Sequence, residues 1–163
     1  MIHHRDAEHA ERSKAMIADA LAEDYVDDPV TREVIGAAIT VHQALGPGLL
    51  ESAYQTCLAH EIRKRGFRAE TEVHLPVSYD GMKLDCGYRL DIVVGDAVIV
   101  EVKAVESVMS VHLAQLLTYL RLAGKSRGLL LNFNVTLLKN GIYRRVLTPT
   151  KSSFPSAISA TLR

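Results

Sequence analysis

Residues 87–105, GYRLDIVVGDAVIVEVKAV, constrain the fold more than any other stretch of the chain. Two runs rich in valine and isoleucine flank a Gly-Asp turn, which is the pattern of two antiparallel β-strands joined by a short loop. Side chains alternate between the faces of a strand, so Glu101 and Lys103 share one face of the second strand. Asp91 interrupts the first strand, where an aspartate is unfavourable. These three charged residues need an explanation.

Helical and extended patterns alternate along the rest of the chain. Helices are predicted over residues 5–24, from near Thr31 to residue 45, over 49–65 and over 110–123. Strands are predicted over 69–79 and 82–94, which meet at an Asp-Gly turn, and over 97–105, 127–133 and 143–147. This order predicts an α/β fold in which a mixed central β-sheet of four or five strands is flanked by α-helices on both sides.

The chain is interpreted as one domain with two flanking segments. Its 163 residues are enough to bury roughly two thirds of the surface that the unfolded chain exposes. We expect the domain over residues 29–148, after an N-terminal helical or flexible extension over 1–28. Pro29 marks this boundary because proline cannot continue a helix interior. Residues 149–163, rich in Ser, Thr and Pro, are expected to be an irregular tail.

The cysteines and the apolar runs indicate neither a secreted protein nor a membrane-spanning one. Cys57 and Cys86 lack the spacing of a metal site, so we expect reduced thiols. Residues 1–14 are polar and lack the apolar segment of a secretory signal. The longest apolar runs are too short to span a bilayer. We therefore expect a cytoplasmic protein with no membrane partner.

Charge is unevenly distributed although the formal net charge is zero. Residues 1–28 hold eight acidic side chains against three Lys or Arg, whereas no acidic residue follows Glu106. A one-sign block of basic residues suits a polyanionic partner such as nucleic acid. The equal alternative is that the basic residues are solvated surface charges whose acidic partners come from the N-terminal segment.

Asp91 turns the strand pair into a candidate metal site. On its own, the pair Glu101 and Lys103 is most simply a surface ion pair on a half-exposed strand. A carboxylate in the middle of an apolar strand, however, needs a partner or a metal. Two carboxylates on neighbouring strands repel each other unless a cation lies between them, and Mg²⁺ favours one or two carboxylates plus water and phosphate oxygens.

This arrangement, Asp91 followed by Glu101-Val102-Lys103, resembles the PD-(D/E)XK nuclease superfamily. The segment GLLESAY, residues 48–54, is similar to the signature of the GxxExxY protein family within it. The segments VHQALGPG, GYRLDIVV, VIVEVKA, AQLLTYL and GLLLNF also resemble that family in the same order, over about residues 30–147. The resemblance implies a restriction-endonuclease-like core and nuclease machinery.

The resemblance also implies a role for each residue of the site. Asp91 and Glu101 match the two main metal ligands, and the backbone carbonyl of Val102 often completes such a set. Glu51 matches an additional acidic metal ligand. The implied ion is Mg²⁺, for which Mn²⁺ can substitute. Lys103 matches the catalytic lysine, which would assist the attacking water or stabilise developing charge.

A Gln-x-x-x-Tyr element on the following predicted helix completes the implied catalytic set. Gln115 and Tyr119 match this element, and His112 lies on the same helix face. Each residue also has a structural interpretation. Glu51 lies in the first turn of its helix, where a carboxylate is favourable, and the alternative for Gln115 and Tyr119 is a hydrogen bond between helices. We expect His42 and His112 to be structural and leave both out of the catalytic set.

The sequence thus predicts Mg²⁺-dependent hydrolysis of phosphodiester bonds in nucleic acid, with DNA favoured over RNA. The alternative is a catalytically silent nuclease fold that binds nucleic acid or assembles with proteins. The sequence carries no recognisable domain that reads a nucleotide sequence, so specificity would come from its basic surface, a protein partner or a homo-oligomer.

The shared metal site requires an unusual strand register. A two-residue loop would pair Val94 with Ala97 and send Asp91 and Glu101 to opposite faces of the sheet, since a shift of one residue reverses every side chain. We therefore predict a three-residue loop, Gly95–Ala97, or a bulge near Asp91.

Overall fold

The structure is a computed structural model, and it describes residues 28–85 and 87–148. Its first part contains α2 (Pro29–Leu45), α3 (Glu51–Lys64), β1 (Ala69–His74), β2 (Val77–Tyr79) and β3 (Met82–Leu84). Its second part contains β4 (Arg89–Val94), β5 (Val98–Lys103), α4 (Ser110–Ala123), β6 (Arg127–Asn132), the short 3₁₀ helix η1 (Leu138–Gly141) and β7 (Ile142–Val146).

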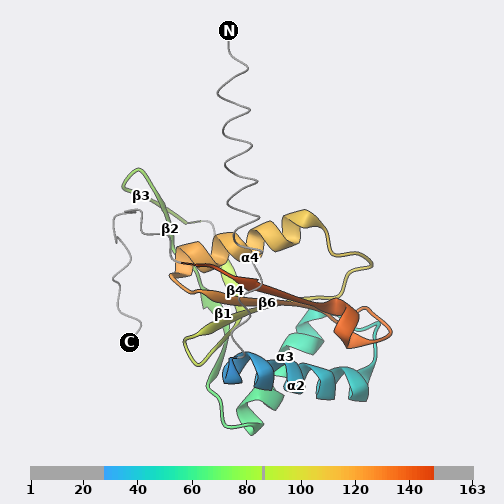
Figure 1. The fold of residues 1–163 in the computed structure, drawn as a ribbon. Helices are drawn as coiled ribbons and strands as arrows, with labels where there is room; N and C mark the ends of the chain where they lie inside the picture. The colour runs from blue at the N-terminus through green and yellow to red at the C-terminus, as the bar shows by residue number, and fades with distance from the viewer. Residues whose placement is uncertain (1–27, 86, 149–163) are drawn as a thin grey trace.

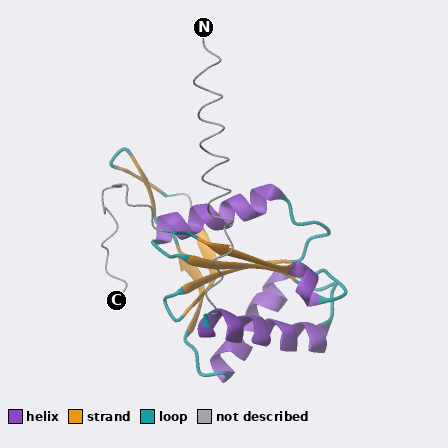
Figure 2. Ribbon diagram, in the orientation of Figure 1, coloured by secondary structure: helices purple, strands orange, loops and turns teal. Residues whose placement is uncertain are grey.

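One five-stranded sheet forms the centre of the molecule, with strand order β1-β4-β5-β6-β7. Neighbouring strands are antiparallel except β5 and β6, which are parallel. Parallel neighbours need a crossover connection, and α4 provides it between β5 and β6. Helices α2 and α3 cover one face of the sheet and α4 covers the other (Figures 1 and 2). The predicted α/β fold with a mixed sheet is confirmed.

Two hydrophobic cores lie on the two faces of the sheet. The core under α2 and α3 contains Tyr54, Leu58 and Ile62 of α3, packed against alternate residues of the strands. The core under α4 contains Leu116, Tyr119 and Leu120. The central strand β5 contributes to both, because its valines face α2 and α3 while Ile99 faces α4. Glu101 follows Ile99 by two residues and is buried with an exposed fraction of 5%.

The predicted start of the second helix, with Thr31 as its N-cap, was wrong by three residues. The helix begins at Pro29 rather than near Thr31, and Asp28 is its N-cap. The Asp28 carboxylate accepts hydrogen bonds from the backbone N–H and the hydroxyl of Thr31. Proline at the first helical position has no N–H to leave unpaired, so Pro29 starts this helix instead of breaking the chain.

The strands on either side of the Asp-Gly turn are shorter than predicted. The turn itself is confirmed, because Tyr79 pairs with Met82 across Asp80 and Gly81. However, the extended runs are each broken, so that β2 and β3 form a separate two-stranded sheet beyond β1 and β4. This hairpin projects away from the central sheet (Figure 1).

Some predictions concern residues outside the described ranges. These are the helix over residues 5–24, the state of Cys86 and the irregular tail over 149–163. Among the described residues, no helix has the length and apolar character needed to cross a membrane.

Candidate functional site

The loop between β4 and β5 places the two predicted metal-ligand residues at the same level of the sheet. Val94 pairs with Val98, so the loop consists of the three residues Gly95–Ala97. Continued by one residue beyond the last pair, this register sets Asp91 opposite Glu101. The predicted three-residue loop is therefore confirmed, and with it the register that the shared site requires.

Asp91 itself lies just beyond the hydrogen-bonded part of the strand pair. The last pair between β4 and β5 is Ile92 with Val100. Beyond it, the backbone N–H of Val102 donates to Oδ2 of Asp91 over 2.8 Å. The backbone N–H of Asp91 donates in turn to Oε1 of Glu101 over 3.5 Å, a long and weak bond. Each carboxylate thus contacts the backbone of the opposite strand at the point where regular pairing ends.

Burial and mutual repulsion make this carboxylate pair hard to ionise. Burial, followed by the neighbouring charge of Asp91, raises the pKa of Glu101 to about 8. Burial also raises the pKa of Asp91, while the hydrogen bond from Val102 and the charge of Lys103 act in the opposite direction. A pair of this kind gains most from a cation, because a cation offsets both desolvation and repulsion.

Glu51 reaches the site from the first turn of α3. Its Oε1 accepts a hydrogen bond of 3.3 Å from the backbone N–H of Ala104, and its Oε2 lies 3.7 Å from Nζ of Lys103. Lys103 thus pairs with Glu51, and its charge lowers the pKa of Asp91 and Glu101. The charges of Glu51 and Lys103 thus act on both Asp91 and Glu101, and the roles of these four residues stay predictions.

The loop before Glu51 is held by Tyr54. Its hydroxyl donates to the carbonyl of Gly46 over 2.6 Å and accepts from the N–H of Leu49 over 3.1 Å. The Tyr54 ring is buried and stacks on Phe133 at 4.5 Å between centroids. Gly48 has φ 106°, a conformation that favours glycine. Gly48 and Tyr54 therefore fix the loop that precedes α3, and with it the position of Glu51 in the first turn of this helix.

Gln115 and Tyr119 lie side by side on α4. The Gln115 amide donates to the Tyr119 hydroxyl over 2.7 Å. Burial, and after it the charge of Glu101, raises the pKa of Tyr119, so this hydroxyl lies within electrostatic reach of the carboxylate pair. The two residues thus approach the site from the sheet face opposite to α3. Their catalytic role stays a prediction.

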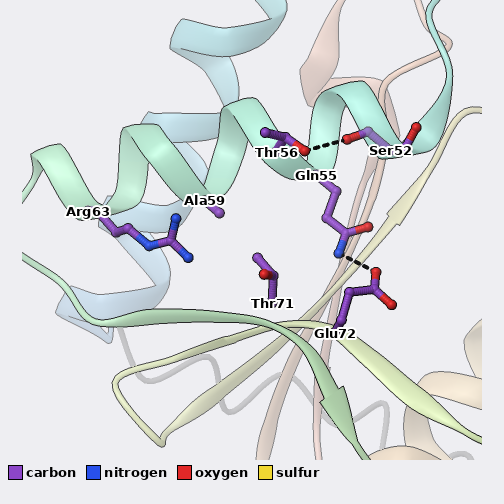
Figure 3. A pocket seen from close by; sticks show the side chains of 7 residues that line it. All are labelled: Ser52, Gln55, Thr56, Ala59, Arg63, Thr71 and Glu72. Atoms are coloured by element: carbon purple, nitrogen blue, oxygen red, sulfur yellow. Dashed lines mark hydrogen bonds between the residues drawn. The ribbon is translucent and has the colours of Figure 1, made fainter.

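Two residues at the site were not predicted. Gln55 donates hydrogen bonds to Oε1 of Glu72 at 2.7 Å and to the backbone carbonyl of Asp91 at 3.0 Å. Both residues line a pocket of about 220 Å³ between α3 and β1, where Figure 3 shows their side chains meeting. The sequence held one signal for Gln55, its position four residues after Glu51 on the same helix face. For Glu72 it held none.

Two histidines are structural, as expected. Nε2 of His42 lies 2.8 Å from the carbonyl of Val135. Nδ1 of His112 accepts from the backbone N–H of Met109 and caps the start of α4. A further buried polar residue, Asn132, exchanges hydrogen bonds with the backbone of Val105. It anchors the chain just after Lys103.

The comparison with protein families agrees with this arrangement of side chains. The family model of the PD-(D/E)XK nuclease superfamily matches residues 28–146. The chain belongs to the PD-(D/E)XK nuclease superfamily. Comparison with curated proteins and with solved structures found no match. The matched range covers nearly all of the described residues and includes every residue of the candidate site.

PD-(D/E)XK nucleases generally use divalent metals, so the candidate site raises the question of which residues can hold such an ion. In the part of the chain that the structure describes, no three His, Cys, Asp or Glu side chains form a complete metal cluster. Mg²⁺ does not require one, because it commonly binds through one or two carboxylates and retains several waters. The carboxylates of Asp91 and Glu101, with their raised pKa values, therefore fit such an ion.

The basic residues of the C-terminal half are partly paired in the fold. Nζ of Lys125 lies 2.6 Å from Oδ1 of Asp96, and Arg127 lies 3.1 Å from Oδ1 of Asp28. Arg127 therefore has its acidic partner at the end of the N-terminal segment, as one of the two interpretations expected, whereas the partner of Lys125 lies outside that segment.

Proposed function

We propose that this protein is a metal-dependent nuclease that hydrolyses phosphodiester bonds in nucleic acid, with DNA as the favoured substrate. The observation that carries the proposal is the alignment of Asp91 with Glu101 at the end of the β4–β5 ladder, with Lys103 beside them. Buried carboxylates with raised pKa values are costly for a purely structural protein, and they cluster at functional sites.

Asp91 and Glu101 would hold the cation, with the backbone carbonyl of Val102 and the carboxylate of Glu51 as additional ligands. Mg²⁺ is the proposed ion and Mn²⁺ its substitute. When bound, the ion would acidify water and neutralise charge on the scissile phosphate. Lys103, 18% exposed and next to Glu51, would donate a hydrogen bond to the attacking water or the phosphate oxygens.

Gln115 and Tyr119 would position the substrate on the α4 side of the site. Their hydrogen bond sets the direction of the Tyr119 hydroxyl. This hydroxyl can donate to a phosphate oxygen, whereas an ionised carboxylate can only repel it. The proposal thus gives the α4 side a binding role and the β4–β5 side the metal-dependent role.

The test compares purified wild type with Asp91→Ala on single-stranded and double-stranded DNA and RNA, with Mg²⁺ or Mn²⁺. Calorimetric titration with Mn²⁺ accompanies the cleavage assay. We expect metal binding and cleavage by the wild type and neither by Asp91→Ala. Equal cleavage by both proteins would refute the assignment. Nucleic-acid binding without cleavage by the wild type would favour the catalytically silent module instead.

A further inference from the structure

Asp91 lies at an irregularity that two strands share. The β1–β4 ladder omits the pair of Glu72 and Asp91, although the pairs on both sides of it are formed. The chain also changes faces at this point, because Ile92 belongs to the core of α2 and α3 whereas Leu90 belongs to the core of α4. In a regular strand, residues two apart share one face. The strand is therefore irregular at Asp91.

Glu72 is the matching irregularity on β1. Its φ of 53° lies in the left-handed region, which is uncommon for residues other than glycine. Its carboxylate accepts a hydrogen bond of 2.7 Å from Nε2 of Gln55 (Figure 3). The same Nε2 donates to the backbone carbonyl of Asp91 over 3.0 Å. The amide group of Gln55 has two N–H donors, and each has a partner here.

Side chains thus replace the main-chain partners of Asp91. Gln55 binds its carbonyl, and Glu101 accepts weakly from its N–H. We infer that Gln55 is a positioning residue: it holds the backbone of Asp91 in the strand break, so that the Asp91 carboxylate meets the N–H of Val102 beside Glu101. Glu72 in turn orients the Gln55 amide.

Gln55 is well placed for a test that leaves the fold intact. It is half-buried on the wall of the pocket of about 220 Å³, outside the packed cores. Gln55→Met retains the unbranched stem and removes both donors. Thr56→Val is the matched control, because the Thr56 hydroxyl lines the same pocket but donates to the Ser52 carbonyl of its own helix.

The first experiment measures hydrogen exchange of backbone amides by NMR in the metal-free protein. If Gln55 positions Asp91, Gln55→Met frees the Val102 N–H from the Asp91 carboxylate. We expect its exchange to become about tenfold faster relative to that of Ile99, in line with local opening. Thr56→Val should leave it unchanged. Equal protection of Val102 in wild type and Gln55→Met would overturn the inference.

The second experiment titrates Mn²⁺ into the same proteins by calorimetry, and this part rests on the proposed function. Residues that orient metal ligands typically contribute about 10- to 100-fold in metal affinity. We expect Gln55→Met to weaken Mn²⁺ binding at least tenfold and Thr56→Val to leave it unchanged. Faster Val102 exchange without weaker Mn²⁺ binding would overturn the link to the metal.

Two further comparisons distinguish failure of this inference from misfolding of the variant and from failure of the proposed function. If Gln55→Met does not fold, Gln55→Glu replaces it, since its carboxylate cannot donate at neutral pH and is repelled by Glu72. The same faster exchange of Val102 is expected. If the wild type binds no Mn²⁺ and cleaves nothing, the proposed function fails, while the exchange experiment still decides whether Gln55 positions Asp91.

Discussion

The carboxylate of Asp91 accepts a 2.8 Å hydrogen bond from the backbone N–H of Val102, the residue next to Glu101. This bond favours the ionised form of Asp91 and partly offsets the burial that raises its pKa. Glu101 has only a weak bond from the Asp91 N–H, and the Asp91 charge raises its pKa further. In the metal-free protein near pH 7, Glu101, with its pKa of about 8, is therefore chiefly protonated.

The first prediction is that the metal-free protein loses stability as the pH rises. In the unfolded chain Glu101 ionises near pH 4.5, whereas in the folded protein its pKa is about 8. Between these values the folded state binds more protons, so the free energy of unfolding falls with increasing pH. Each pKa unit is equivalent to about 1.4 kcal/mol. Glu101→Gln should remove most of this fall.

Urea unfolding at pH 5 and pH 8, with a chelator present, measures the effect. Glu101→Gln should be more stable than wild type at pH 8 and similar to it at pH 5. Glu106→Gln, at an exposed position, is the matched control and should follow the wild type. An equal loss of stability between the two pH values in wild type and Glu101→Gln would contradict the prediction.

The second prediction concerns metal and thermal stability. Millimolar Mg²⁺ or Mn²⁺ should raise the melting temperature of the wild type, because a ligand that binds only the folded state stabilises it. The increase should be larger at pH 8 than at pH 6, since the cation competes with the proton on Glu101. An unchanged melting temperature at both pH values would count against the site.

Asp91→Asn separates repulsion from metal binding in the same assay. The asparagine oxygen can still accept from the Val102 N–H, but the negative charge is lost. We expect a higher melting temperature than wild type without metal, and almost no further increase when metal is added. A metal response equal to that of the wild type would show that Asp91 is not a ligand.

The strand register was predictable from the sequence because it follows from two local requirements. Alternation predicts the faces of β5 and of β4 as far as Ile92, and carboxylates that share a cation must lie on one face. Only a loop of three residues, or a bulge, satisfies both, and the loop is Gly95–Ala97. The end of helix α4 was equally predictable from the sequence, since its apolar pattern ends at Gly124, which has the left-handed conformation of a C-cap.

The break in β1 at Glu72 could not be predicted from the sequence. An alternating segment such as Ala69–His74 indicates a regular strand, and nothing local marks Glu72 for a φ of 53°. Glu72 accepts a hydrogen bond from Gln55, a tertiary contact with a residue 17 positions earlier that no local pattern indicates. The start of α2 is a different case, because Asp28 followed by Pro29 is a capping signal that a preference for Thr31 overlooked.

The third prediction concerns the approach to Glu51. Tyr54→Phe retains the ring that stacks on Phe133 but removes the hydroxyl that binds Gly46 and Leu49. Unfolding by urea should show a loss of about 1–3 kcal/mol, the usual cost of leaving buried polar groups unsatisfied. Tyr79→Phe, at a position that is 71% exposed, should cost almost nothing. Equal stability of the two variants would mean that the hydroxyl does not hold the loop.

The fourth prediction assigns Lys103 to rate and not to metal binding. Its Nζ lies 3.7 Å from Oε2 of Glu51, and its charge favours the ionised forms of Asp91 and Glu101. Because Lys103 is not itself a proposed metal ligand, Lys103→Ala should retain most Mn²⁺ binding in calorimetry, while cleavage slows by roughly a hundredfold or more, the scale for one acid–base or charge-stabilising group. Loss of Mn²⁺ binding would instead make Lys103 a structural partner of the acidic residues.

Lys103→Arg distinguishes the chemistry of the lysine from its charge. The guanidinium keeps the positive charge beside Glu51, but it does not lose a proton and its planar shape differs from that of an ammonium group. We expect Mn²⁺ affinity close to wild type and cleavage nearly as slow as in Lys103→Ala. Cleavage restored to the wild-type rate would show that positive charge alone suffices, and that Lys103 acts by electrostatic stabilisation without transferring a proton.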